Sequence, residues 1–265
     1  MSTQLAAQMY TLREHCQDAA GIAESCRKVK AMGYDAIQAS AAFFAEIEGS
    51  AFRTILDDTG LVCCATHRSW EQLQDVQAEI DFHAAIGCKY AAIGGWGWSG
   101  DETEDDWKKF AADFQALADP YAAAGLRIGY HNHSHEWAPF GLAAAPEQID
   151  PKRTPMELLV RELGDPTFFE IDTYWVAHAG GDVAHWLNRL AGRIGAIHLK
   201  DMTINAKREH KMCEVGAGNL NWPAVLDAAR AAGVEWYIVE RDAGDLDPFE
   251  SLRISLENCK AMGLR

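Results

Sequence analysis

The stretch DWKKFAADFQALADPYAAAGLRIGYHNH, residues 106–133, contains one complete repeating unit of the fold. Its first part has apolar residues at helical spacing and ends at Gly125, and a short apolar run over residues 127–133 follows directly. A glycine at a helix end supplies the left-handed conformation that satisfies the last helical carbonyl groups. We therefore interpret this stretch as a helix followed by a buried strand that ends in histidines.

The same alternation of helical patterns and short apolar runs continues along the whole chain. Helical patterns also close at Gly33, Gly60, Gly87 and Gly233. The runs that we interpret as strands are residues 5–10, 34–40, 61–67, 90–95, 127–133, 167–172, 194–201 and 236–242. Apolar strands that each precede a helix are typical of a parallel sheet covered by helices.

Eight such units in 265 residues predict an α/β fold, a closed (β/α)8 or TIM barrel that forms a single domain over residues 1–265. The alternative, an open dinucleotide-binding sheet, is disfavoured because no G-x-G-x-x-G motif follows the first strand. The longest irregular stretch, residues 138–155, is interpreted as a loop that covers the substrate.

Composition limits the classes of partner. The chain has 24 Lys and Arg against 39 Asp and Glu, a formal net charge of −15. Nucleic acid and anionic membranes bind basic surfaces, so we expect neither as a partner and favour a small molecule. No apolar run approaches the roughly 18 residues of a membrane span, and the N-terminal residues lack the features of a signal peptide. We therefore expect a cytoplasmic protein.

Polar side chains gather at the predicted C-terminal ends of the strands, where the active site of this barrel type lies. Side chains two residues apart on a strand face the same side, so His131 and His133 point together, as do His198 and Lys200. The strand-end residues are Gln8, Gln38, His67, His131, His133, Asp172, His198, Lys200 and Glu240.

Four of these residues, His131, Asp172, His198 and Glu240, end four neighbouring strands. Imidazole and carboxylate groups without a thiolate suit one divalent cation, Mn²⁺ first, with Co²⁺, Mg²⁺, Fe²⁺ or Zn²⁺ as alternatives. Each residue also has a structural interpretation by itself: Asp172 could cap the helix that follows, and His198 could be a hydrogen-bonded core residue. Their convergence on one barrel end predicts a metal site.

Several motifs together resemble the xylose-isomerase-like barrel superfamily, and more narrowly its sugar isomerase/epimerase branch. They are QMYTLRE (8–14), GYHNHSHEW (129–137), FEIDTYWVAHAGGD (169–182), RIGAIHLKDM (193–202) and EVGAGNLNWPAVLDAARAAGVEWYIVERD (214–242). The resemblance covers essentially the whole chain. It implies one metal held by Glu, Asp, His and Glu, of which Asp172, His198 and Glu240 match the last three. At the first position this chain has His131 instead, and Glu136 is the alternative ligand.

The resemblance implies an isomerase or epimerase that removes a proton next to the carbonyl of a keto-sugar. On this hypothesis the metal polarises the carbonyl, and Glu240 or His133 removes the proton. Lys200 stabilises the resulting negative charge, and His131, His133 or Glu136 returns a proton. The Glu and His pair is asymmetric, so a lyase or dehydratase acting on a 3-keto-glycoside or inosose is the alternative. A non-catalytic barrel that binds a ligand or partner is the second alternative.

We expect the substrate to contact Gln8, Gln38, His67 and Arg208. The tryptophans Trp96, Trp98, Trp137 and Trp175 follow strands four to six. They could line the mouth of the barrel for a carbohydrate, or they could pack the loops. The glycine-rich residues 214–222 suggest an anion at a helix N-terminus. The resemblance also permits a homo-oligomer, whereas the charge of −15 argues against a DNA-repair endonuclease on the same barrel.

Overall fold

Eight parallel strands form a closed barrel in the computed structural model, which describes residues 4–40, 47–141 and 150–265. The strand order around the barrel is β1-β10-β7-β6-β5-β4-β3-β2, which confirms the predicted (β/α)8 fold. The strands are β1 (Gln4–Gln8), β2 (Ala36–Ser40), β3 (Val62–Arg68), β4 (Tyr90–Ile93), β5 (Arg127–His131), β6 (Phe168–Asp172), β7 (Ile194–Leu199) and β10 (Trp236–Val239).

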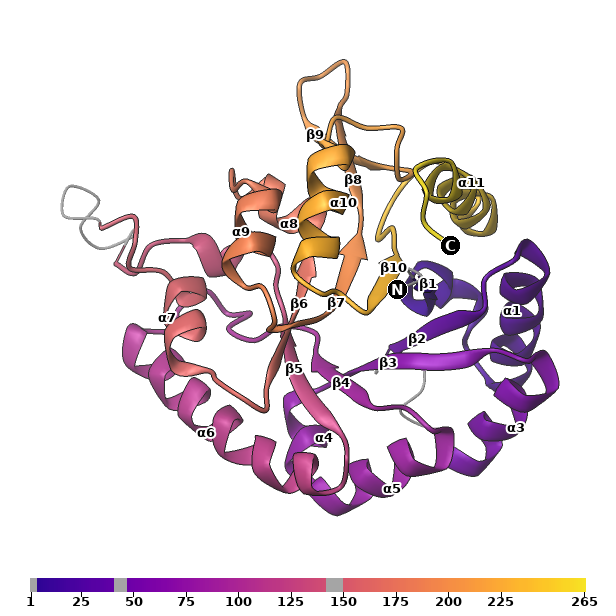
Figure 1. Ribbon diagram of the computed structural model, residues 1–265, viewed down its shortest axis with the longest axis horizontal. Coiled ribbons are helices and arrows are strands. Elements are labelled where there is room, and N and C mark those ends of the chain that lie inside the picture. The colour runs from indigo at the N-terminus through magenta and orange to yellow at the C-terminus, as the bar shows by residue number, and fades with distance from the viewer. Residues whose placement is uncertain (1–3, 41–46, 142–149) are drawn as a thin grey trace.

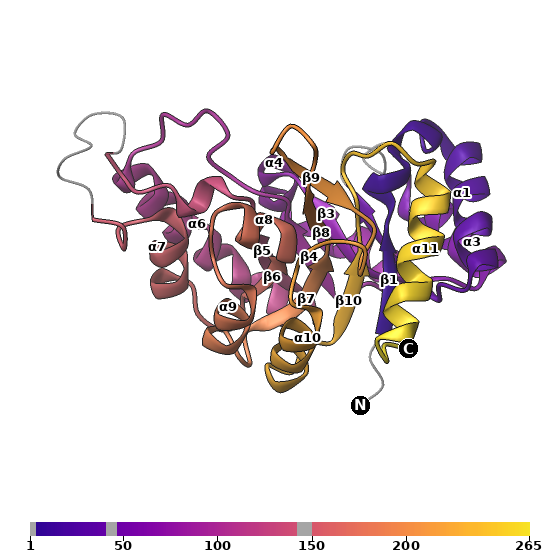
Figure 2. The ribbon, with the colours of Figure 1, turned by 90° about the horizontal axis from the view of Figure 1, so that it is seen from above.

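Helices surround the strands, and the last helix completes the ring beside the first unit (Figures 1 and 2). The α-helices are α1 (Ala19–Met32), α3 (Gly49–Thr59), α4 (Trp70–Gln74), α5 (Val76–Ile86), α6 (Glu104–Ala123), α7 (Pro155–Glu162), α8 (Thr173–His178), α9 (Val183–Arg189), α10 (Trp222–Ala231) and α11 (Pro248–Ala261). Two 3-10 helices, η1 (Met9–His15) and η2 (His135–Trp137), follow strands β1 and β5. Gly33, Gly60 and Gly87 end α1, α3 and α5 in the left-handed conformation, as predicted.

The barrel interior is apolar near the N-terminal ends of the strands and polar near their C-terminal ends. Phe168 points inward between β5 and β7, and a Cβ at Gly129 would lie 2.5 Å from its ring. The glycines at this level therefore make room for a large side chain, which fills the lower barrel. Above it, buried polar residues such as Gln38, Glu170 and His198 occupy the interior. This change places the site at the end that the sequence predicted.

The segment after β7 is an antiparallel hairpin, β8 (Asp201–Ile204) and β9 (His210–Cys213), which extends away from the barrel (Figure 1). The predicted strand over residues 194–201 is therefore two residues too long. The strand ends at Leu199, and Lys200 separates it from the hairpin.

The glycine-rich residues 214–222 do not offer an open anion site. The buried carboxylate of Asp201 accepts hydrogen bonds from the backbone N–H groups of Gly216, Gly218 and Leu220. The expected anion is therefore a side chain of the protein itself.

Within the described residues, no helix combines the length and apolar character needed to cross a membrane. The predicted substrate-covering loop lies partly outside the described residues, which omit 142–149. On its far side, α7 begins at Pro155.

Candidate active site

Four of the predicted ligands meet at the C-terminal end of the barrel. Suitable donor atoms of His131, Asp172, His198 and Glu240 all lie within 4.8 Å of one another, and all four residues are buried. The Nε2 atom of His131 lies 3.1 Å from Nδ1 of His198 and 3.4 Å from Oδ2 of Asp172. The same Nδ1 of His198 lies 2.7 Å from Oε2 of Glu240. The structure thus gathers two imidazoles and two carboxylates from four neighbouring strand ends.

These residues fit a divalent metal ion. Oδ2 of Asp172 and Oε2 of Glu240 are buried and accept no hydrogen bond of good geometry from the described residues. Buried carboxylate oxygens are ordinarily satisfied, because an unsatisfied charged group is costly. Nitrogen and carboxylate donors without a thiolate are the set that Mn²⁺, Zn²⁺ and related ions accept.

A second, overlapping group could also offer three imidazoles, from His67, His131 and His198. Nε2 of His67 lies 3.2 Å from a carboxylate oxygen of Glu170. Because His67 already has an anionic partner there, we favour the group that contains Asp172 and Glu240.

Glu170 is a buried residue that the sequence analysis missed, and it lies behind His198. Nε2 of His198 forms an ion pair with Glu170 and lies 2.6 Å from the amide oxygen of Gln38. A carboxylate behind a ligating imidazole fixes the ring orientation and directs the other ring nitrogen to the metal. The sequence could have identified Glu170, because it lies two residues before Asp172 on the same strand and therefore faces the same side.

Gln8 and Gln38 belong to this supporting network. The amide of Gln8 donates to Gln38 over 2.8 Å, and the amide of Gln38 donates to Glu170 over 2.7 Å. Both glutamines are fully buried. The expectation that they contact substrate is therefore not met in this structure, because they lie beneath the four donor residues.

Lys200 lies among three carboxylates. Its Nζ is 3.0 Å from Asp172, 2.7 Å from Glu240 and 2.9 Å from Asp242. Burial alone would lower the pKa of Lys200, but these carboxylates raise it well above its usual value. Burial raises the pKa of Asp242 to about 6, against the opposing effect of Lys200. Lys200 is thus a buried cation that balances the negative charge of the site.

The histidines differ in charge. Burial, and then the neighbouring His198, lower the pKa of His131 to about 4, so His131 is neutral at neutral pH. Burial also lowers the pKa of His133 well below its usual value. For His198 burial acts in the same direction, but Glu170 and Glu240 raise its pKa well above the usual value. Without a metal, His198 is therefore an imidazolium ion.

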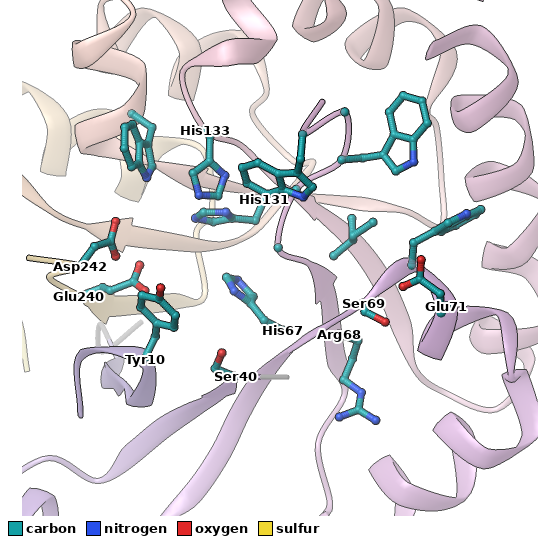
Figure 3. A pocket seen from close by; sticks show the side chains of 18 of the residues that line it. Tyr10, Ser40, His67, Arg68, Ser69, Glu71, His131, His133, Glu240 and Asp242 are labelled. Carbon is teal, nitrogen blue, oxygen red and sulfur yellow. The ribbon is translucent and has the colours of Figure 1, made fainter. Parts of the chain in front are cut away.

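A cavity of about 880 Å³ opens above the four donor residues (Figure 3). The predicted residues that line it are His67, Trp96, Trp98, His131, His133, Trp175, Lys200 and Glu240. Trp96 contributes little free aromatic surface, since its ring stacks on Phe110 with centroids 4.5 Å apart.

Two predicted residues lie apart from the donor group. The buried carboxylate of Glu136 accepts hydrogen bonds from the Tyr130 hydroxyl at 2.8 Å and from the His133 N–H at 2.9 Å. The structure therefore places His131, and not Glu136, beside the other three donors. Arg208 is exposed in the turn between β8 and β9 and does not line the cavity.

The fold and the site together define a class: a (β/α)8 barrel with mixed imidazole and carboxylate donors at its C-terminal end. A family profile described as "Xylose isomerase-like TIM barrel" matches residues 26–262. The chain belongs to this family, in agreement with the resemblance seen in its motifs.

Individual relatives are more distant or match only in part. An inosose dehydratase of Geobacillus thermodenitrificans is 31% identical over 167 residues, which are 56% of this chain and 52% of that protein. The chain thus spans about half the length of this curated relative.

Solved structures match over nearly the whole chain. A sugar phosphate isomerase/epimerase from Parabacteroides distasonis has a TM-score of 0.78 at 23% identity, covering 99% of this chain and 95% of the other. A D-allulose 3-epimerase from Methylomonas sp. has a TM-score of 0.73 at 16% identity, covering 98% of each chain. At these identities the likeness shows the fold alone.

Proposed function

We propose that the protein is a divalent-metal-dependent enzyme that removes a proton next to the carbonyl of a sugar or keto-sugar. The observation that carries the proposal is the group of four buried donors, two of which, His131 and Glu240, line a large cavity. The sugar enzymes among its relatives support the substrate class. Mn²⁺ occupancy, a cytoplasmic location and a homo-oligomer remain predictions.

His131, Asp172, His198 and Glu240 would hold the metal. A divalent ion bound there supplies Lewis-acid polarisation of the substrate carbonyl. Glu170 and Gln38 hold His198 in the orientation that this role requires.

Glu240 is the leading candidate for the base. Its Oε2 atom lies 2.7 Å from both Lys200 Nζ and His198 Nδ1, and the residue lines the cavity. Burial would raise the pKa of Glu240, but Lys200 and His198 lower it far below its usual value, so the group is ionised. Lys200, 2.7 Å away, places a positive charge where negative charge develops on the substrate oxygen.

His133 is the second group able to move a proton. Its imidazole lines the cavity, is neutral because burial lowers its pKa, and has an Nδ1 atom without a hydrogen-bond partner among the described residues. Its backbone N–H is held by Glu136. His133 therefore competes with Glu240 as base and is the leading candidate to return the proton.

Isomerisation or epimerisation is the first candidate outcome, with the proton returned to carbon. Dehydration is the second, with the proton given to a departing hydroxyl. The unequal pair of a carboxylate and an imidazole favours elimination, because proton removal and leaving-group protonation need different acidities. The partial match to an inosose dehydratase supports the same outcome.

The test is metal content and α-proton exchange in D₂O with a panel of keto-sugars and inosose. We expect about one ion per wild-type chain, and exchange that a chelator abolishes and added Mn²⁺ restores. Glu240→Gln should lower exchange by about 10²–10⁴-fold, the range of a general base, while Arg208→Ala stays unchanged. A chain that holds no ion after reconstitution would contradict the proposal and favour a non-catalytic binding barrel.

A further inference from the structure

The cavity extends well beyond the four donor residues. From Glu240 it passes His67 and continues over β3 and β4 to Ser69 and Glu71 (Figure 3). Trp98 also lines the cavity. A water molecule occupies roughly 30 Å³ in the liquid, so 880 Å³ corresponds to on the order of thirty non-hydrogen groups. This is well over twice the number in a free hexose. The cavity as a whole is thus large enough for a second group of similar size.

Trp98 lines the cavity with an aromatic ring. Its side chain is 63% exposed, which is unusual for a tryptophan. The ring lies edge-on to His133 at 4.8 Å and tilted against His135 at 5.0 Å, between centroids. It also packs so closely over Gly95 that a Cβ there would clash with it. One side of Trp98 is thus supported by the protein, and the remainder is open.

Hydrogen bonds between residues of the same loop stabilise the loop that contains Trp98. The carboxylate of Glu102 accepts from the N–H and hydroxyl of Ser99, at 3.1 and 2.7 Å, and from the N–H of Gly100 at 3.0 Å. A ring held in place before binding loses little entropy when a ligand stacks on it.

The charges of the cavity argue against a phosphorylated substrate. Arg68 and Lys200 are its lysine and arginine residues among the described part of the chain. Arg68 is paired with Glu79 and Lys200 with three carboxylates. The undescribed segments, 1–3, 41–46 and 142–149, contain no lysine or arginine in sequence.

The other charged residues that line the cavity are acidic. Glu71 and Glu102 line the part over β3 and β4, and Asp242, which is paired with Lys200, lines another part. An added phosphate would meet these carboxylates without a free cation to balance it.

We propose that the substrate is an uncharged keto-glycoside. Its oxidised ring lies above the four donor residues, and its second ring lies against Trp98 over β3 and β4. This inference rests on the proposed function, because it assigns the reacting ring to the same site.

The experiment uses Mn²⁺-reconstituted protein and three probes: a free 3-keto-hexose, its 6-phosphate ester, and a disaccharide that contains the same 3-keto ring. Binding is measured by calorimetry and reaction by α-proton exchange in D₂O. We expect the disaccharide to have a kcat/KM at least 10-fold above the free sugar. The phosphate ester should be the weakest of the three.

Variants of Trp98 distinguish a direct contact with the second sugar ring from a general disruption of the loop. Trp98→Ala should lower kcat/KM for the disaccharide about 10-fold more than it lowers kcat/KM for the free sugar, because only the disaccharide has a ring that contacts Trp98. Trp98→Phe should retain most of the disaccharide preference, since it keeps an aromatic face. Leu246→Ala, which removes an exposed apolar side chain outside the cavity, is the control.

A wild-type protein that prefers the free sugar or the phosphate ester would overturn the inference. An equal loss on both uncharged probes in Trp98→Ala would also overturn it. Proton exchange without a disaccharide preference would leave the proposed function standing. Tight disaccharide binding without exchange on any probe would support the second subsite and refute the proposed function.

Discussion

Two buried aspartates lie at the C-terminal end of the barrel, and their surroundings differ sharply. Both Asp201 and Asp172 are fully buried. The oxygens of Asp201 accept five hydrogen bonds, from the N–H groups of Met202, Gly216, Gly218 and Leu220 and from the indole of Trp222. Oδ1 of Asp172 accepts one from the N–H of Trp175, as a helix cap, and Oδ2 accepts none.

Asp201 stabilises the fold, whereas Asp172 is one of the four residues that we propose as metal ligands. Five donors compensate the desolvation of Asp201, so its local structure is complete. At Asp172 only one oxygen is used by the fold. The second faces His131, His198 and Lys200, where it is available to the divalent ion that we propose.

The largest expected effect is loss of stability in Asp201→Asn. The amide would present N–H groups to N–H donors and leave at least two of them unsatisfied, at about 1–3 kcal/mol each. We expect the free energy of unfolding to fall by about 3 kcal/mol or more in urea titrations of chelator-treated protein. Asp172→Asn, which retains an oxygen for the helix cap, should cost less under the same conditions. An equal or larger cost for Asp172→Asn would refute the comparison.

Added metal should make Asp201→Asn more stable than Asp172→Asn, which is the opposite of their order without metal. At about 100 times the Kd, a bound ion stabilises the folded state by about 2.7 kcal/mol. Mn²⁺ should therefore raise the Tm of the wild type and of Asp201→Asn, but not of Asp172→Asn. Thermal unfolding followed with and without Mn²⁺ checks this, and a similar Tm increase in Asp172→Asn would place the ion elsewhere.

Glu170→Gln tests the support behind His198. Loss of a carboxylate behind a ligating histidine typically weakens metal binding 10–100-fold, and we expect that loss in Mn²⁺ calorimetry. Glu136→Gln is the matched control, since it removes a buried carboxylate that does not contact His198. If instead Glu136→Gln weakened binding and Glu170→Gln did not, Glu136 would be the ligand and His131 would not.

The smallest effect concerns pH. Glu170 and Glu240 raise the pKa of His198, so its imidazole carries a proton at neutral pH in the metal-free protein. Metal binding must displace this proton, and affinity should therefore rise with pH, by up to about tenfold per unit, until the pH exceeds that pKa. Mn²⁺ affinity measured from about pH 6 to 8 checks the sign. A constant affinity over this range would mean that His198 is already neutral.

Much of the fold follows from local patterns in the sequence. Glycine ends the helices because it alone adopts the left-handed conformation without strain, and this is true whatever surrounds it. The eight strands were predicted from short apolar runs, and each is present. The hairpin of β8 and β9 was missed because polar and apolar residues are mixed in its two short strands, neither of which is an apolar run.

The four residues predicted as ligands lie close together because strand ends meet at one rim of any such barrel. What the sequence left open was the choice between His131 and Glu136, and the surroundings of each residue. Gln38 and Glu170 face the interior just as a substrate-binding residue would, so alternation alone could not show that they lie beneath His198.

The sequence by itself determined the barrel and the residues at its rim, because both depend on periodicity along one strand or helix. Only the tertiary structure decided which side chains meet. Between β6 and β7 the register shifts after Phe169, so that Asp172 pairs with His198. A shift of one residue moves every following side chain to the other face of a strand. That irregularity leaves no local signature, yet it brings the carboxylate and the imidazole into one site.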